Sequence, residues 1–293
     1  MKIGDVKTIA VLGAGTMGHG IAQICAQSGF QVRLEDAKEE FVENGLERIR
    51  KFLQGGIERK KITKEEADAV LSRIKGTVDL NEAVKDADLV IEAIVENMEI
   101  KKKLFKELDN ISKREAVLAS NTSTLSITEI ASVKSRPEKV VGMHFSNPVQ
   151  LMKPVEIVKG VLTSDDTVEL IKSITLKLGK IPLVVKDSPG FVSSRLSQSF
   201  FVEASKILEE GVASVKDIDV GAKLFHAHKM GPFETCDLVG LDVRLNNLNA
   251  LYQATGDPKW SPPLLLKQLV ISGYLGKKPG SKGGYYAYFG LEE

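Results

Sequence analysis

The sequence contains few of the residues that mark several classes of protein. Of its 293 residues only two are cysteine, Cys25 and Cys236, which supplies neither a disulfide framework nor a zinc-ligand spacing. No apolar run reaches the length that spans a bilayer, and the N-terminal MKIGDVK lacks the apolar core of a signal peptide. These absences predict a reduced, cytoplasmic protein in which both cysteines are buried thiols.

Neither sign of charge is in excess. The chain has 40 Lys+Arg and 39 Asp+Glu residues, a formal net charge of +1. This balance argues against a general nucleic-acid binder and against a binder of membrane surfaces. With 43% hydrophobic and 27% charged residues, the chain is long enough for one large or two ordinary domains with buried cores.

A glycine-rich loop between two β-type runs is the most informative motif. The apolar run Thr8–Leu12 is followed by glycines at the spacing G-x-G-x-x-G, a stretch of helical length and a second run, Phe30–Leu34. This order, within about 30 residues, is that of a βαβ unit that binds a dinucleotide pyrophosphate at a helix N-terminus. The predicted cofactor contacts in this loop are Gly13, Gly15, Thr16, Met17 and Gly18.

An acidic residue follows the second run and bears on which dinucleotide binds. Asp36 lies at the distance from the glycines at which a carboxylate accepts hydrogen bonds from the adenosine ribose. A carboxylate repels the 2′-phosphate of NADP, so Asp36 predicts NAD as the cofactor. Arg33 lies nearby but within the run, which makes it a weaker partner for a 2′-phosphate.

A charged helical pair is predicted at about residues 38–75. Phe41–Gln54 has a helical stripe of apolar residues, which Gly55-Gly56 is expected to break, and Thr63 with Glu66 forms a capping box for a second helix. These helices are rich in Lys and Arg, including Arg50 and Arg59. Two interpretations stay open: a solvated basic face, or a site for the phosphates of a ligand such as coenzyme A.

The alternation of strands and helices then continues to about residue 188. Strands are expected at Asp88–Val95, Ala116–Ser120, Val140–Phe145, Val155–Val158 and Ile181–Val185, with helices between several of them. Such alternation predicts a doubly wound α/β sheet over residues 1–188. Residues 189–293 contain long helical patterns and no convincing strand, which predicts a separate all-α domain.

Two residues in neighbouring strands are candidates for acid–base chemistry. If Val140–Phe145 and Val155–Val158 pair as an antiparallel hairpin about Gln150, His144 faces Glu156 on one side of the sheet. A carboxylate on one imidazole nitrogen supports the other nitrogen as a general base. A structural histidine held by a convenient glutamate is the open alternative.

Nine motifs together resemble the L-3-hydroxyacyl-CoA dehydrogenase family, in particular its 3-hydroxybutyryl-CoA type. They are GAGTMGHGIA, Asp36, EAIVEN (92–97), SNTSTL (120–125), HFSNP (144–148), PVEIV (154–158), DSPGF (187–191), MGPFE (230–234) and GKKPG (276–280). The resemblance implies a Rossmann-like NAD-binding domain, a helical domain that binds substrate and forms a homodimer, and NAD-dependent oxidation of a 3-hydroxyacyl-CoA in fatty acid β-oxidation.

The resemblance also implies roles for individual residues. His144 is the base for the substrate hydroxyl, Glu156 supports it, and Ser123 binds the substrate near its reacting oxygen and touches the nicotinamide side. Judged from the residues alone, Glu96 and Lys101 are surface charges and Lys278 is a tail lysine. By resemblance, the further cofactor contacts are Glu96, Lys101, Ser123, Asn147 and Lys278, and the substrate contacts are Ser123, Asn147, Ser194, Arg50 and Arg59.

Two departures from the family pattern stand out. PGFVSSR places Ser194 where the family usually has an Asn that contacts the substrate, and LFHAHKMGPF contains two additional histidines. His226 and His228 are expected at a helix end or on the surface, and no metal site is predicted. The alternatives to the leading function are a dehydrogenase of a free 3-hydroxy acid or a sugar acid, and a non-catalytic NAD-binding relative.

Overall fold

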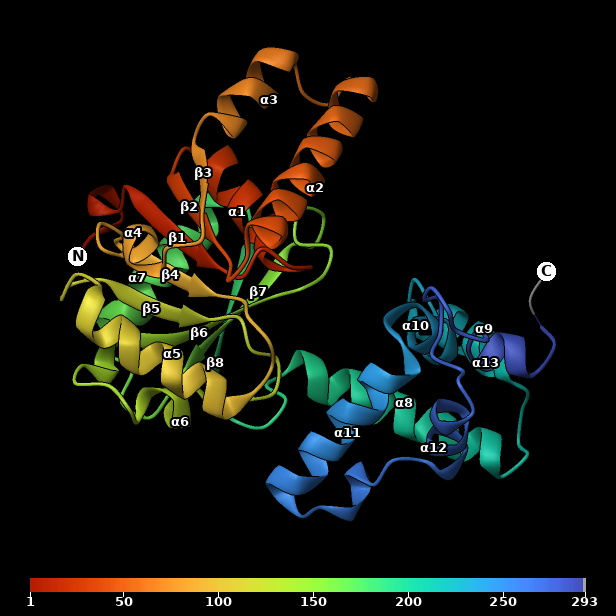
Figure 1. Ribbon diagram of the computed structural model, residues 1–293. Helices are drawn as coiled ribbons and strands as arrows, with labels where there is room; N and C mark the ends of the chain where they lie inside the picture. The colour runs from red at the N-terminus through yellow and green to blue at the C-terminus, as the bar shows by residue number, and fades with distance from the viewer. Residues whose placement is uncertain (292–293) are drawn as a thin grey trace. The chain divides into compact units, whose positions relative to one another are not determined.

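The computed structural model describes residues 1–291. The described chain divides into two compact units, Met1–Ser188 and the part from Pro189 onward. The first unit is a doubly wound α/β domain and the second is helical in its described part (Figure 1). The predicted fold class is therefore confirmed. None of the described helices is long and apolar enough to cross a membrane.

The first unit is built on one eight-stranded sheet of order β3-β2-β1-β4-β5-β6-β7-β8. The strands from β3 to β6 run parallel, β7 pairs antiparallel with β6, and β8 is parallel to β7. The order 3-2-1-4-5-6 is that of the dinucleotide-binding fold. The strands are β1 Thr8–Leu12, β2 Gln31–Glu35, β3 Ile74–Thr77, β4 Leu89–Glu92, β5 Val117–Ser120, β6 Val140–Phe145, β7 Pro154–Lys159 and β8 Ile181–Lys186.

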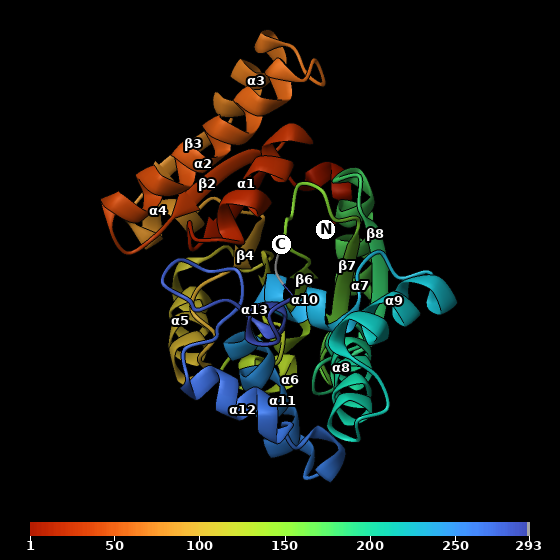
Figure 2. The same cartoon turned by 90° about the vertical axis from the view of Figure 1, so that its right-hand side faces the viewer.

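Helices cover both faces of this sheet. Ile9 and Val11 of β1 share a core with Ile21 and Ile171 of two helices, while Ala10 between them is also fully buried. Because successive strand side chains point to opposite faces, burial of both sets requires cover on each side. Figure 2 shows α7 beside β7 and β8. The helices are α1 Gly18–Gln27, α2 Glu39–Glu58, α3 Lys64–Leu71, α4 Leu80–Val84, α5 Met98–Ile111, α6 Ile127–Ala131 and α7 Asp165–Lys177, with short 3₁₀ turns at Ile3–Asp5 and Pro137–Lys139.

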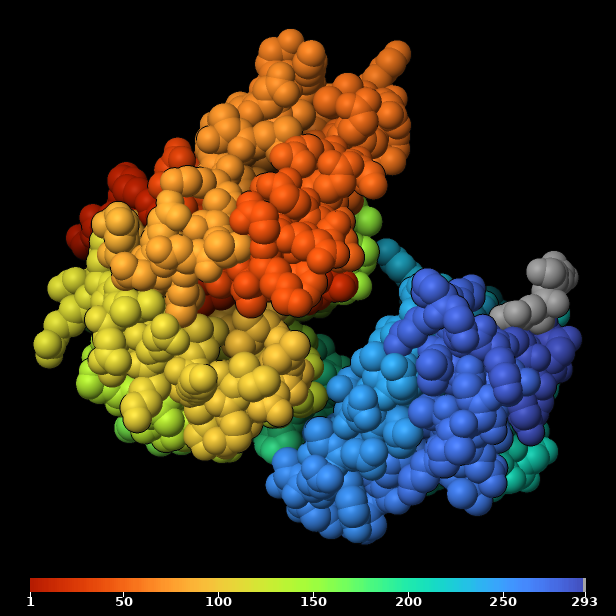
Figure 3. Space-filling model, in the orientation of Figure 1, coloured from red at the N-terminus to blue at the C-terminus, as the bar shows by residue number. Residues whose placement is uncertain are grey.

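The predicted helical pair is present, with one correction. Helix α2 continues through Gly55-Gly56 to Glu58, so the two glycines do not break it. A helix tolerates glycine where the lack of a side chain permits close packing, and a Cβ at Gly56 would lie 3.2 Å from Ile62. Thr63 and Glu66 form the expected capping box at the start of α3. The pair stands out from the body of its unit (Figure 3).

In the described part of the second unit the regular elements are helices around one core that includes Phe201, Phe233 and Trp260. Two of them, α10 and α13, are not among the long helical patterns of the sequence, because they are too short to show a clear apolar period. Both predicted buried thiols are confirmed, since Cys25 and Cys236 are fully buried. The helices are α8 Ser193–Glu209, α9 Val215–His226, α10 Pro232–Val239, α11 Leu241–Thr255, α12 Leu264–Ile271 and α13 Tyr285–Tyr288, with a 3₁₀ turn at Pro258–Trp260.

Candidate active site

The glycine loop joins β1 to α1 and has little room for side chains. Gly13 has φ of +96°, and a Cβ there would lie 2.6 Å from the carbonyl oxygen of Ala93. A Cβ at Gly18 would lie 1.6 Å from the Gly13 oxygen, so α1 can pack this closely only with glycine. A Cβ at Gly15 would meet no atom within 4 Å. A side chain at Gly15 would therefore project into open space and not into the packed protein.

Asp36 is held against this loop. The amide N–H of Ala14 donates to Asp36 Oδ2 and that of Ala37 donates to Oδ1, each at 2.8 Å. The loop and Asp36 line a cavity of about 900 Å³. Its other walls include the chain after β4, with Ile94, one side of α5 and residues at the start of α2 such as Phe41. An open glycine-lined cradle, an acidic residue at one end and apolar walls fit the phosphates, ribose and adenine of a dinucleotide.

Glu35 is a second carboxyl group in this cavity, which the sequence analysis did not single out. Burial raises its pKa to about 7, with further contributions from the negative charges of Asp36 and Glu107. The carboxyl group of Glu35 therefore gives up its proton less readily than that of an exposed glutamate. The sequence did contain an indication that Glu35 lies near the cofactor site. It is the last residue of β2 and directly precedes Asp36.

His144 and Glu156 lie opposite each other, as the predicted antiparallel hairpin requires. The two residues are direct partners in the antiparallel register of β6 and β7. His144 Nδ1 lies 2.8 Å from Glu156 Oε2, and the exposed fractions of the two side chains are 14% and 4%. Asn121 accepts a hydrogen bond from the amide N–H of Phe145 at 2.9 Å, which ties the end of β6 to the turn after β5. Asn147 lies on the exposed segment just beyond.

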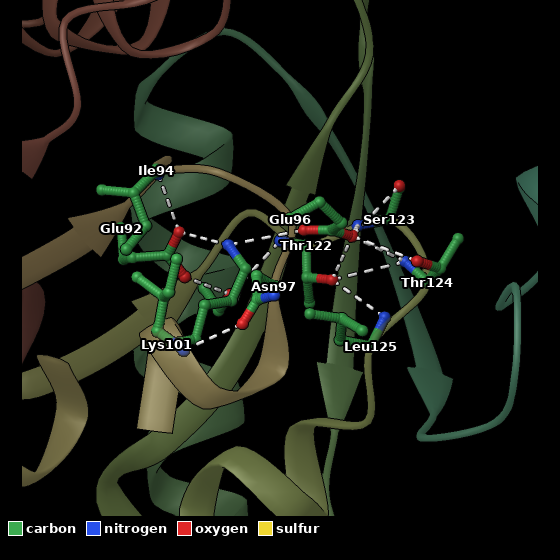
Figure 4. Close-up of polar contacts among 11 residues, drawn as sticks. Glu92, Ile94, Glu96, Asn97, Lys101, Thr122, Ser123, Thr124 and Leu125 are labelled. Atoms are coloured by element: carbon green, nitrogen blue, oxygen red, sulfur yellow. Dashed lines mark hydrogen bonds and ion pairs between the residues drawn. The ribbon is translucent and has the colours of Figure 1, made fainter. Parts of the chain in front are cut away.

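The SNTSTL segment forms a polar turn around one carboxylate (Figure 4). Glu96 Oε1 accepts hydrogen bonds from Thr122 Oγ1 at 2.6 Å, from the Ser123 amide at 2.9 Å and from Ser123 Oγ at 3.3 Å. Burial acts to raise the pKa of Glu96, but the charge of Lys101 and the hydrogen bonds from Thr122, Ser123 and Thr124 outweigh it and lower the pKa.

Lys101 is not the surface charge that its sequence context alone suggests. Its side chain is 1% exposed and forms an ion pair with Glu92, which is fully buried, and a second with Glu96 at 3.4 Å. One feature of the sequence indicated this ion pair. Glu92 lies in the apolar run of β4, and a buried charge needs a partner. The partner is nine residues away across a loop, which no local pattern indicates.

Arg50 and Arg59 lie on the helical pair. The Arg50 guanidinium pairs with Glu43 at 3.9 Å and Glu47 at 3.6 Å and lines a cavity of about 810 Å³ between α2 and α3. The Arg59 guanidinium folds back toward Gly55. The ion pairs of Arg50 are half-exposed, and pairs of this kind contribute little to stability.

The second unit holds the remaining predicted site residues. Ser194 is the second residue of α8 and is half-buried, while Lys278 pairs with Asp242. Arg244, not singled out from the sequence, is buried and donates from Nη1 to Ser197 Oγ at 2.8 Å. His226 ends α9, and both it and His228 are exposed with ring contacts to Phe200. The expectation of a helix end and a surface position is met.

Comparisons with known proteins agree with this arrangement. Residues 8–188 match the model of the 3-hydroxyacyl-CoA dehydrogenase NAD-binding domain, and residues 190–288 match that of the 3-hydroxyacyl-CoA dehydrogenase C-terminal domain. A probable 3-hydroxybutyryl-CoA dehydrogenase of Bacillus subtilis is 45% identical over 284 residues, covering 97% of this chain and 98% of the relative. Human mitochondrial hydroxyacyl-coenzyme A dehydrogenase is 39% identical, covering 97% and 91%.

A solved structure is also closely similar. The crystal structure of (S)-3-hydroxybutyryl-CoA dehydrogenase PaaH1 from Ralstonia eutropha has a TM-score of 0.92 and 41% identity, covering 96% of this chain and 99% of that one. Family models that together span most of the chain, and relatives matched over nearly their whole length, establish the assignment. The chain belongs to the 3-hydroxyacyl-CoA dehydrogenase family of NAD-dependent oxidoreductases.

Proposed function

We propose that the chain interconverts (S)-3-hydroxyacyl-CoA and 3-oxoacyl-CoA, that 3-hydroxybutyryl-CoA is its main substrate, and that it serves β-oxidation in the cytoplasm. The observation that carries the proposal is the 2.8 Å contact between His144 Nδ1 and Glu156 Oε2. This contact supports a general base, and the relatives named for 3-hydroxybutyryl-CoA support the short chain. Two free, buried cysteines suit a reducing compartment.

In this mechanism the protein moves one proton. Neutral His144 donates its Nδ1–H to Glu156, which fixes the tautomer and leaves Nε2 to accept the proton of the substrate C3 hydroxyl. Bound NAD supplies the acceptor for the hydride that leaves C3. Glu156 then stabilises the imidazolium, and its near-complete burial strengthens that interaction. The Ser123 hydroxyl donates to the substrate oxygen, and the reverse reaction uses the same groups in the opposite order.

The cofactor proposal extends beyond the glycine loop. We assign the adenosine ribose to Asp36, and the nicotinamide side to Ser123, Glu96 and Asn147. Lys101 contacts Glu92 and Glu96 and is 1% exposed, so we propose that it serves the cofactor through Glu96. Lys278 is assigned to NAD by resemblance, and Ser123, Asn147, Ser194, Arg50 and Arg59 to the substrate, the arginines through coenzyme A phosphates.

A comparison of substrates tests the proposed function. The enzyme should turn over 3-hydroxybutyryl-CoA far faster than free 3-hydroxybutyrate, because only the CoA ester can use the basic groups of α2. Similar turnover of the free acid would overturn the CoA assignment. A series of acyl-CoA substrates from four to sixteen carbons then tests the short-chain preference, which a rate maximum at long chains would contradict.

Asp36 should determine the preference for NAD over NADP. The charge of Asp36 repels a 2′-phosphate, so Asp36→Asn, which removes the charge and keeps an acceptor for the Ala14 amide, should narrow the NAD:NADP ratio of kcat/KM by about 10-fold or more. Asp36→Ala should also lower kcat/KM with NAD, because the loop loses its hydrogen bond. Equal efficiency of the wild type with both cofactors would show that Asp36 is not at the ribose.

Ser194 should tolerate the residue that is usual in the family. If Ser194 binds substrate, Ser194→Asn keeps or raises turnover, because a carboxamide reaches farther than a hydroxyl. Ser194→Ala should change turnover by less than about 10-fold, the value of one positioning hydrogen bond. Steady-state kinetics on both variants measure this. A collapse of activity in a folded Ser194→Asn variant would show that the pocket is built around serine.

The chain should form a homodimer through its second unit. It exposes large apolar side chains, including Phe225 at 86%, Ile271 at 85% and Leu224 at 78%, and exposed apolar surface of this kind marks an interface. Light scattering at micromolar concentration should give about twice the 32.0 kDa chain mass. A mass near that of one chain would contradict the proposal.

A further inference from the structure

Glu92 is a fully buried carboxylate at the end of an otherwise apolar strand, β4. One oxygen, Oε1, accepts the amide N–H of Ile94 at 2.8 Å and pairs with the ammonium of Lys101. The other, Oε2, accepts the hydroxyl of Ser120 at 2.6 Å. Glu92 therefore joins the ends of two neighbouring strands to the first turns of α5. The assigned chemistry gives Glu92 no role, and of its contacts it uses only Lys101.

Lys101 carries this connection toward the site (Figure 4). Its Nζ lies between Glu92 and Glu96, and the 1% exposure of its side chain excludes water from most of its surface. Asn97 caps α5, accepting from the Ile100 amide at 3.1 Å, and its carbonyl accepts the Lys101 amide at 3.0 Å. The backbone of Lys101 is thus fixed by the start of the helix, and its ammonium by two carboxylates.

Glu96 is the member of this group that contacts the predicted substrate-binding turn. Besides Thr122 and Ser123, its Oε1 accepts the amide and the hydroxyl of Thr124, each at 3.2 Å. Five donors surround this one oxygen, more than its lone pairs, so they share it, and hydrogen bonds to a carboxylate are stronger than those to a neutral acceptor. The Ser123 hydroxyl, at 3.3 Å, has the longest of these contacts and is the one most easily turned toward a ligand.

We propose that Glu92 is a positioning residue for the reaction: it fixes the ammonium of Lys101, which holds the Glu96 carboxylate toward the 122–124 turn, and so presents the Ser123 hydroxyl. Glu92 acts through two other side chains and touches no reacting atom. The inference rests on the role proposed for Ser123, but the order of the turn can be measured without turnover.

Variants that keep or remove the balance of buried charge distinguish a positioning role of Glu92 from a purely structural one. Glu92→Gln leaves the Lys101 ammonium with one carboxylate, and Lys101→Met leaves the buried Glu92 carboxylate without a cation, so each single change destabilises the protein. The double variant Glu92→Gln/Lys101→Met removes both buried charges and should recover much of that stability. It cannot restore the attraction that Lys101 exerts on Glu96.

Hydrogen exchange of the 121–125 segment is the decisive measurement, because two of its amides donate to Glu96. In the double variant these amides should exchange at least about 10-fold faster than in the wild type, and kcat should fall by about 10-fold or more. Asp109→Asn is the matched control, since it removes a carboxylate paired with the buried Lys134 away from this turn. It should lower stability and leave both readouts unchanged.

A mutant cycle that combines Ser123→Ala with the double change tests whether the Glu92–Lys101 pair acts through the turn. Adding the double change to Ser123→Ala should reduce kcat little further, because the hydroxyl that the network presents is already absent. Normal exchange and kcat in the double variant, or fully additive losses in the cycle, would overturn the inference. A wild type that does not oxidise 3-hydroxyacyl-CoA would refute the proposed function instead, and the exchange data would still decide whether the Glu92–Lys101 pair orders the turn.

Discussion

Replacing His144 by Gln is expected to lower turnover of 3-hydroxybutyryl-CoA by at least about 10²-fold, the usual loss when a general base is removed. Glutamine can keep a hydrogen bond to Glu156 but cannot accept a proton at neutral pH. The affinity for NAD should stay nearly unchanged, because the glycine loop and Asp36, not His144, line the dinucleotide cavity. Steady-state kinetics and NADH fluorescence titration measure the two quantities.

His226→Gln is the matched control for this experiment. His226 is an exposed histidine at the end of α9 and has no part in the proposed chemistry. Its replacement should leave turnover within about twofold of the wild type, since surface changes away from a site have small effects. Wild-type turnover in His144→Gln would remove His144 from the mechanism, and an equal loss in both variants would mean that the losses are not specific to the base.

Gly15→Val is expected to abolish NAD binding and leave the fold intact. A Cβ at Gly15 meets no protein atom within 4 Å, so the valine side chain enters the cavity where the pyrophosphate approaches the backbone. We expect the Kd for NADH to rise by at least about 100-fold, whereas the melting temperature changes little. Fluorescence titration and thermal unfolding together test this.

Two further glycines provide the contrast. Gly18→Ala forces a Cβ to 1.6 Å from the Gly13 oxygen, so it should lower the melting temperature as well as the affinity. Gly4→Ala, whose Cβ also meets nothing within 4 Å, should change neither. Tight NADH binding by Gly15→Val would show that the pyrophosphate does not pass over this residue.

The sequence predicted those parts of the site in which local spacing determines geometry. The glycine loop and Asp36 are brought together by a βαβ unit of nearly fixed length. His144 opposes Glu156 because an antiparallel register is fixed once its turn is located. In both cases the residues that must meet lie on one strand–turn–strand or strand–helix–strand unit.

What the sequence did not predict depends on tertiary packing. Lys101 has the sequence context of a surface lysine in a Lys-rich helix, and its burial follows from a carboxylate on a different element. The continuation of α2 through Gly55-Gly56 depends on the close packing of Ile62, which intrinsic propensity does not include. Arg244 is buried through contacts to α8, which no spacing within α11 indicates.

The glycines of α2 have a consequence for motion. Glycine in a helix interior costs about 0.5–1 kcal/mol relative to alanine, so two in succession near the last turn lower the free energy of opening that end. The capping box of α3 stabilises only the far side of the connection. Native-state opening should therefore start at the tip of the helical pair, and a ligand that contacts the closed tip would have to hold it closed. Part of the binding energy of that ligand would be spent on suppressing the opening, so it would bind more weakly than to a rigid tip.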